Sequence, residues 1–201
     1  MADPSPSIPR LTPGGAAVMF VDQQTGIADL PGLTVDIARL RRAVNALAQI
    51  AKIFELPAVV SAVPNQDGTQ PTVFSEIVDN VPTAPILTRS TTDSFADEAI
   101  RAVLERTGRR TLLVSGVLTE VAVQLPSISA AAAGYEVFVV LDACAGAYKR
   151  SEDAAIQRMG LAGIAMTSIP GLIGELAGDF SRARGQAAIG VLYALLRGVP
   201  A

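Results

Sequence analysis

The chain has 201 residues, of which 50% are hydrophobic, 17% charged and 4% aromatic, and its formal net charge is −3. This length and hydrophobicity fit one globular domain over residues 1–201 and exclude disordered and fibrous proteins. Because the chain has no histidine, Ser-His-Asp and Cys-His catalysis are excluded, as are imidazole-bound metal sites. We therefore expect no metal and no cofactor.

Charge and hydropathy exclude two classes of partner. The basic residues form no run longer than the pairs 41–42 and 109–110, so we expect no nucleic-acid partner. Uncharged stretches stay below about 18 residues and contain proline and glycine, so we expect no membrane partner. The first ten residues lack the basic and apolar regions of a leader, and one cysteine can form no internal disulfide. These features predict a cytoplasmic protein.

The first third of the chain reads as strand, helix, strand and loop. Residues 16–21 are a continuous apolar run, which predicts a buried strand. Residues 36–54 carry apolar side chains at three- and four-residue spacing, which predicts an amphipathic helix. A second strand is expected over 56–63. Four prolines, with Asn, Asp and Gly, make residues 64–85 mostly irregular, with room for one short helix.

The middle of the chain predicts two further strand-helix units. Residues 85–89 read as a strand, and the helix after it starts at Asp93-Ser94 and ends at Gly108. Residues 111–116 form an uncharged strand, and residues 119–133 form a helix of small residues that Gly134 ends. Pro126 should kink this helix, because proline lacks the N–H that a helix interior needs.

The last third completes the alternation. We expect strands over 135–141 and 163–167, a helix over 151–159, and another that opens near Pro170. The final helix, over 182–197, carries apolar residues around much of its circumference, which favours packing between subunits of a homo-oligomer. Six strands alternating with helices are typical of an α/β protein with a mostly parallel sheet.

Polar residues follow four of the expected strands, at the carboxyl edge where sites of parallel sheets form. They are Asp22, Arg89, the segment 116–119 and the segment 142–144. If strands one, three and four are neighbours, Asp22 and Arg89 face each other as carboxylate and guanidinium. A helix cap or a structural ion pair is the competing interpretation. Motifs for nucleotides or a serine nucleophile (GxxxxGK[ST], GxGxxG, GxSxG) are absent.

Three motifs, in order, carry a resemblance to a known family. They are Val21-Asp22-Gln23-Gln24 at the end of the first strand, Arg89 followed six positions later by Phe95, and Ser115-Gly116-Val117-Leu118-Thr119-Glu120-Val121-Ala122-Val123. Gly134-Tyr135-Glu136-Val137 and Leu141-Asp142-Ala143-Cys144 continue the order. Over about residues 15–178 the chain resembles the isochorismatase-like cysteine hydrolases. This resemblance implies a three-layer α/β/α sandwich with Rossmann-like topology.

The resemblance also implies a catalytic set of Asp, Lys and Cys acting on a small amide or related C–N bond. Asp22 matches the Asp, Arg89 stands at the Lys position, and Ala122 stands where the nucleophilic Cys belongs. A permanent cation still lowers a thiol pKa, so arginine is compatible with this chemistry. The resemblance further implies an oxyanion hole of the backbone N–H groups of Leu118 and residue 122, and a cis peptide between Val117 and Leu118.

For the substrate-binding lining we predict four residues, Gln24, Phe95, Thr119 and Pro126. Cys144, the one cysteine, lies in another loop, and we interpret it as a packing residue. Three explanations of Ala122 remain open. It is an engineered change that inactivates an amidohydrolase, or the chain is a vinyl-ether hydrolase of the isochorismatase type that needs no cysteine. In the third, the chain is a natural pseudoenzyme that binds small molecules.

Overall fold

A computed structural model describes residues 10–198; residues 1–9 and 199–201, the two ends of the domain expected over 1–201, lie outside the described residues. Six parallel strands form one sheet in the order β3-β2-β1-β4-β5-β6. Their bounds are β1 Ala16–Val21, β2 Ala58–Ala62, β3 Ile86–Thr88, β4 Thr111–Gly116, β5 Glu136–Val140 and β6 Ala165–Thr167. The predicted six-stranded parallel sheet is confirmed.

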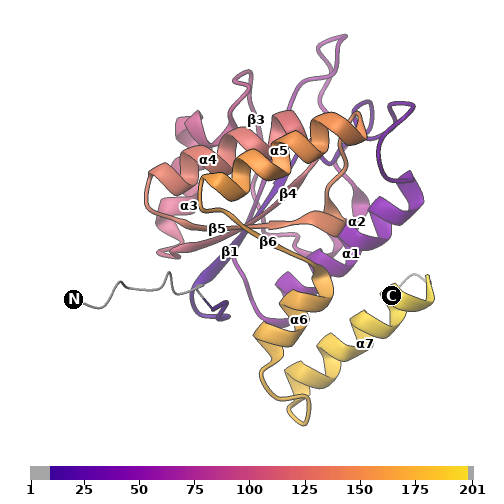
Figure 1. The fold of residues 1–201 in the computed structure, drawn as a ribbon, viewed down its shortest axis with the longest axis vertical. Coiled ribbons are helices and arrows are strands. Elements are labelled where there is room, and N and C mark those ends of the chain that lie inside the picture. The colour runs from indigo at the N-terminus through magenta and orange to yellow at the C-terminus, as the bar shows by residue number, and fades with distance from the viewer. Residues whose placement is uncertain (1–9, 199–201) are drawn as a thin grey trace.

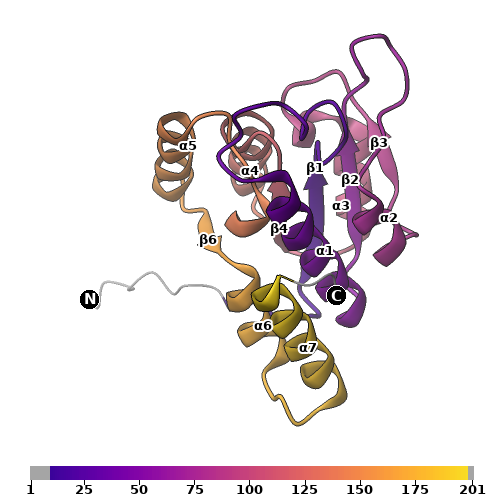
Figure 2. The same ribbon diagram turned by 90° about the vertical axis from the view of Figure 1, so that its right-hand side faces the viewer.

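Helices cover both faces of the sheet and make three layers (Figures 1 and 2). One face carries α1 Ile37–Ile53, α2 Ser75–Asn80, α6 Ile169–Ala177 and α7 Ala183–Arg197. The other face carries α3 Glu98–Arg106, α4 Gln124–Ala132 and α5 Lys149–Leu161. Short helical turns complete the chain at η1 Ser94–Ala96, η2 Thr119–Val123 and η3 Leu141–Ala143.

The central strand shows why a continuous apolar run marks the middle of such a sheet. Every residue of β1 is buried, and successive side chains enter opposite layers. Phe20 packs in the cluster beneath α1, whereas Met19 and Val21 pack in the cluster beneath α3 to α5. A strand with helices on both sides needs apolar side chains at every position.

The single helix predicted over 119–133 is wrong in its first turn. Residues 119–123 form a π-helical turn, and regular α-helix begins at Gln124. Pro126 is the third residue of α4, where the missing N–H interrupts no bond of the helix interior. A change of helix type thus precedes the proline. The helix expected after Asp93 is likewise divided, into η1 and α3.

Close contact between β1 and β4 depends on Gly116. A Cβ at this position would lie 2.4 Å from the Val21 carbonyl oxygen, far inside contact distance. Val21 pairs with Gly116 in the sheet, and the Val117 N–H donates to the Val21 carbonyl oxygen at 3.1 Å. Glycine therefore lets the carboxyl ends of the two strands meet.

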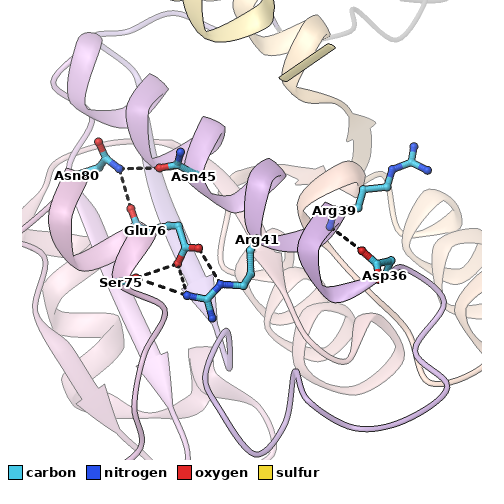
Figure 3. A network of polar contacts seen from close by, with 7 residues as sticks. All are labelled: Asp36, Arg39, Arg41, Asn45, Ser75, Glu76 and Asn80. Carbon is cyan, nitrogen blue, oxygen red and sulfur yellow. Dashed lines mark hydrogen bonds and ion pairs between the residues drawn. The ribbon is translucent and has the colours of Figure 1, made fainter. Parts of the chain in front are cut away.

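An ion pair fastens α2 to α1 and, through α2, the segment that precedes it (Figure 3). Arg41 of α1 donates two hydrogen bonds to the Glu76 carboxylate, at 2.7 and 2.8 Å, and its guanidinium lies 4.5 Å from the ring centroid of Phe74. The Phe74 N–H donates to the Gln23 carbonyl oxygen at 3.0 Å. The anchored helix thus holds the loop before it against the end of β1.

The last helix packs on α1 and α6 and projects with α6 away from the carboxyl edge of the sheet (Figure 2). Its buried residues are Gly185, Ala188 and Val191. Tyr193 and Leu196 remain more than half exposed, so part of its apolar surface is uncovered in the single chain. No helix within the described part of the chain is long and apolar enough to span a membrane.

Candidate active site

Asp22 follows β1 directly, and its backbone turns there into the left-handed region, with φ of 54°. This conformation costs a residue other than glycine about 1–2 kcal/mol, and aspartate tolerates it better than most. The Asp22 N–H donates to the Ser61 carbonyl oxygen at 2.9 Å, which holds the turn against β2. The side chain is only 8% exposed. The fold therefore fixes one carboxylate at the carboxyl edge of a central strand.

Arg89 follows β3, and its guanidinium reaches Asp22 across the intervening β2. Nη2 donates to Asp22 Oδ2 at 2.7 Å, Nε donates to Ser61 Oγ at 2.8 Å, and Nη1 donates to the Thr91 carbonyl oxygen at 2.6 Å. Of the three strands whose adjacency would bring the two residues together, β1 and β4 are neighbours, whereas β2 separates β1 from β3. The pair still forms because the arginine side chain is long enough to span the extra strand.

The environment of the pair makes Asp22 a group that titrates near neutral pH. Burial raises the pKa of Asp22 from its ordinary 3.8 to about 6, although the charge and hydrogen bond of Arg89 act in the opposite direction. Oδ1 is buried and has no hydrogen-bond partner among the described residues. A carboxyl group with this pKa and one free oxygen can accept a proton and deliver it again.

Ala122 lies in η2, just after β4, and is buried in the same apolar cluster as Val21 and Phe95. Its N–H donates to the Leu118 carbonyl oxygen at 2.7 Å, so this expected oxyanion donor is occupied. The Leu118 N–H has no hydrogen-bond partner within residues 10–198. Of the two expected donors, the structure thus leaves one free. The peptide bond between Val117 and Leu118 is cis.

Cys144 is enclosed in the same cluster as Ala122, after η3. It is 1% exposed, and its Sγ donates to the Val140 carbonyl oxygen at 3.3 Å. Burial raises the pKa of the thiol to about 12. Since the thiolate is the nucleophilic form, Cys144 has the surroundings of a packing residue and not of a catalytic one.

Two of the four predicted substrate-binding residues use their polar side-chain groups in hydrogen bonds to other protein groups. Gln24 donates through Nε2 to the Val63 carbonyl oxygen at 2.9 Å and accepts from the Val63 N–H at 3.0 Å. Thr119 donates its hydroxyl to Glu152 Oε1 at 2.8 Å and is fully buried. Gln24 therefore joins the loops after β1 and β2, and Thr119 joins η2 to α5.

The other two residues predicted to bind substrate, Phe95 and Pro126, are buried in the protein interior. Phe95 is 4% exposed and meets the ring of Tyr135 edge-on, with centroids 5.6 Å apart. Pro126 is buried in the first turn of α4. The structure brings Phe95 into the cluster of Ala122, whereas nothing in it places Pro126 toward a ligand.

A cavity of about 720 Å³ opens between the loops that follow β1 and β2, a volume in the usual range of small-molecule sites. Of the predicted site residues, Gln24 lines the cavity, whereas Asp22, Arg89 and Ala122 are not among its lining residues. Within residues 10–198 no group of three or more acidic or cysteine side chains is placed to hold a metal ion.

Sequence reasoning missed Ser61 and Glu152, which position the candidate site. Ser61 is the one hydroxyl of β2 and receives Nε of Arg89. A lone polar residue in an apolar strand was the available signal. Glu152, one of several charged residues at the start of α5, holds Thr119 and had no distinguishing pattern.

The sequence model of the isochorismatase domain matches residues 16–170. The chain belongs to the isochorismatase family. It is 30% identical over 172 residues to the probable hydrolase YcaC of Escherichia coli, covering 85% of this chain and 82% of that one. The family resemblance drawn from the three motifs is thereby confirmed, and the family is one of hydrolases.

Two solved YcaC structures agree with this assignment. YcaC from Pseudomonas aeruginosa, described with hexane-2,5-diol and covalent acrylamide, superposes with a TM-score of 0.87 at 31% identity and 96% coverage of both chains. The YcaC gene product of Escherichia coli, described as an octameric hydrolase of unknown specificity, has a TM-score of 0.83 at 29% identity. That match covers 98% of this chain and 92% of the other.

Proposed function

We propose that this chain carries the site of a cysteine hydrolase for small non-peptide amides, with alanine at the nucleophile position. As it stands, it binds such compounds without cleaving them. The observation that carries the proposal is the buried Asp22–Arg89 pair. Oδ1 of Asp22 has no hydrogen-bond partner in the part of the chain that the structure describes and could accept the proton of a thiol. The covalent acrylamide in the related structure supports a nucleophilic group in that relative, because acrylamide becomes covalently attached when a nucleophile adds to its alkene.

A thiol at residue 122 completes a balanced reaction. Asp22 Oδ1 takes the thiol proton, and the sulfur attacks the amide carbonyl carbon while the Leu118 N–H donates to the developing oxyanion. The C–N bond then breaks, and Asp22 returns the proton to the leaving amine. Water, deprotonated by Asp22, attacks the thioester and releases the acid and the thiol. Arg89 holds Asp22 in position and favours the thiolate by its charge.

The decisive experiment is Ala122→Cys, tested on a panel of small primary amides by ammonia release. We expect turnover in this variant, none in the parent, and none in Ala122→Ser, whose hydroxyl lacks an acidic proton of suitable pKa. Asp22→Asn in the Ala122→Cys background should slow turnover at least about 100-fold, since it removes the proton carrier.

Labelling separates a chemical failure from a structural one. Iodoacetamide should alkylate residue 122 of the Ala122→Cys variant, read by mass spectrometry of its peptide, and leave Cys144 intact. A variant that is alkylated there and keeps the parent melting temperature, yet releases no ammonia from any amide, contradicts the proposal.

A second function has one observation in its favour. Because burial raises the pKa of Asp22 to about 6, part of this group is protonated near neutral pH and can act as an acid. Protonation of an enol ether is the step that a vinyl-ether hydrolase needs, and it requires no cysteine. Hydrolysis of isochorismate by the parent chain would establish this function and displace the amide proposal.

We also propose a homo-oligomer built in part through α7. Support comes from the octamer described for the Escherichia coli relative and from exposed apolar side chains, those of Tyr193 and Leu196 on α7 and that of Phe180 shortly before it. Leu196→Glu should reduce the mass measured by light scattering, while Leu161→Glu, a matched change on exposed α5, should not. An unchanged mass for both variants contradicts a role of α7.

A further inference from the structure

The cavity beside the candidate site is unbalanced in charge. Ten residues of two loops form its lining, and one of them is ionisable, Asp67. They are Gln24, Thr25, Gly26, Ile27, Leu30, Val63, Pro64, Asn65, Gln66 and Asp67. No lysine or arginine is among these described residues, so the wall carries negative charge and no cation to offset it.

Asp67 is held as an anion. Its Oδ1 accepts from the Thr69 N–H at 2.9 Å and from the Thr69 hydroxyl at 2.6 Å. These hydrogen bonds hold the pKa of Asp67 below its ordinary value. The carboxylate is therefore charged throughout the neutral range.

The cation of the candidate site, Arg89, offers an anionic ligand no guanidinium nitrogen that is free of a hydrogen bond within the protein. Arg89 is 3% exposed and gives one hydrogen bond each to Asp22, Ser61 and Thr91, one from each guanidinium nitrogen. Its charge is balanced by the Asp22 carboxylate at 2.7 Å. A carboxylate ligand entering this edge would meet one unpaired anion, Asp67, and no unpaired cation among the lining residues.

Two of the polar side chains that line the cavity already form hydrogen bonds within the protein. Gln24 is paired at both ends of its amide with Val63, and Asn65 Nδ2 donates to Thr69 Oγ1 and to the Gln70 carbonyl oxygen. Apolar side chains, Ile27 and Leu30 among them, supply much of the remaining wall. Such a surface binds by shape and apolar contact and needs no charge on the ligand.

We infer that this cavity admits uncharged or cationic small molecules to the site and excludes anions, carboxylates in particular. The inference rests on the proposed function, and it adds the premise that the cavity leads to residue 122. It names the substrate class within that function, a neutral amide, and disfavours isochorismate, which carries two carboxylates.

The local charge can be measured without any ligand, because the chain has no tryptophan. Leu30→Trp places a single indole on the cavity wall, and Leu161→Trp places one on exposed α5 as the control. Quenching by iodide, acrylamide and caesium compares an anion, a neutral molecule and a cation. Relative to acrylamide, iodide should quench the cavity indole at least about twofold less than the control, and caesium more.

Asp67→Asn in the Leu30→Trp background should abolish this difference, since it removes the one charge of the lining. Iodide quenching at residue 30 that equals or exceeds the control overturns the inference. So does a difference that persists unchanged in Asp67→Asn, because another group would then be its source.

Access to residue 122 is tested by two alkylating agents of nearly equal size. In Ala122→Cys, the ratio of iodoacetamide to iodoacetate rates should exceed the ratio for free glutathione about tenfold, and Asp67→Asn should reduce it. A preference for iodoacetate overturns the inference. Neither measurement needs turnover, so selective alkylation without ammonia release would count against the proposed function alone.

Discussion

Nη2 of Arg89 donates a 2.7 Å hydrogen bond to Oδ2 of Asp22, in surroundings that leave 3% and 8% of the two side chains exposed. The two residues are 67 positions apart in sequence and lie on opposite sides of β2. The two opposite charges stabilise each other in a place where water does not solvate them. The pair therefore controls both the stability of this edge and the ionisation of the carboxylate.

Removing the arginine should destabilise the protein strongly. Arg89→Met leaves the Asp22 carboxylate buried without a countercharge, and we expect the free energy of unfolding to fall by about 3–5 kcal/mol at pH 8. Adding Asp22→Asn should recover part of this loss, because no uncompensated charge then remains. Urea denaturation of the parent, both single variants and the double variant measures the coupling. If the two single substitutions changed the free energy of unfolding additively in the double variant, the predicted coupling would be contradicted.

The raised pKa of Asp22 predicts a stability that increases as the pH falls. The folded protein holds this proton with a pKa of about 6 and the unfolded chain with the ordinary 3.8, so the folded state binds it more tightly. Ionised Asp22 thus costs stability above pH 6, and acidification toward pH 4 relieves it. The contribution amounts to about 1.4 kcal/mol between pH 8 and pH 5 and approaches about 3 kcal/mol at lower pH.

Asp22→Asn isolates this contribution from other titrating groups. The difference in unfolding free energy between the parent and Asp22→Asn should change by the stated amount from pH 8 to pH 5, in favour of the parent at the acidic end. A difference that does not vary with pH, or that favours the parent at the alkaline end, would refute the raised pKa.

How much of the fold the sequence predicts depends on how local its causes are. The run 16–21 predicts a central strand because burial on both faces demands apolar residues throughout. The turn type of η2 escaped prediction, because small apolar residues satisfy α- and π-helical spacing alike. Strand order also escaped, since the place of β2 between β1 and β3 depends on long-range pairing that no single segment encodes.

In the candidate site, too, the features with local causes are predictable and those that depend on long-range contacts are not. The places of Asp22 and Arg89 after strands are predictable from the sequence. Their contact follows from it only if strands one, three and four are neighbours, and the contact forms although β2 separates β1 from β3. The role of Ser61 could be seen only with β2 in place. Gln24 and Thr119 were expected to face a ligand, and their hydrogen bonds to Val63 and Glu152 depend on loops far away in sequence.

Native Cys144 should be nearly inert. With a pKa of about 12, its thiolate fraction at pH 8 is about 1,000-fold or more below that of an exposed thiol, and burial blocks approach as well. Alkylation by iodoacetamide at pH 8, followed by mass spectrometry, should leave the folded parent unmodified and label it fully in urea. Stoichiometric labelling of the folded chain, faster than its unfolding, would contradict the burial of this thiol.

The two glycines Gly116 and Gly190 should respond oppositely to the same change. Gly116→Ala places a methyl group 2.4 Å from the Val21 carbonyl oxygen, so the ends of β1 and β4 must separate, at a cost of at least about 2 kcal/mol. Gly190 lies exposed in α7 with open space around it, and Gly190→Ala should stabilise the helix by about 0.5–1 kcal/mol. Thermal and urea unfolding measure both effects.

Because Asp22 follows Val21 directly, Gly116→Ala in the Ala122→Cys background should also lower ammonia release at temperatures where the protein stays folded, whereas Gly190→Ala should not. Equal effects of the two substitutions would contradict the close approach of the strands.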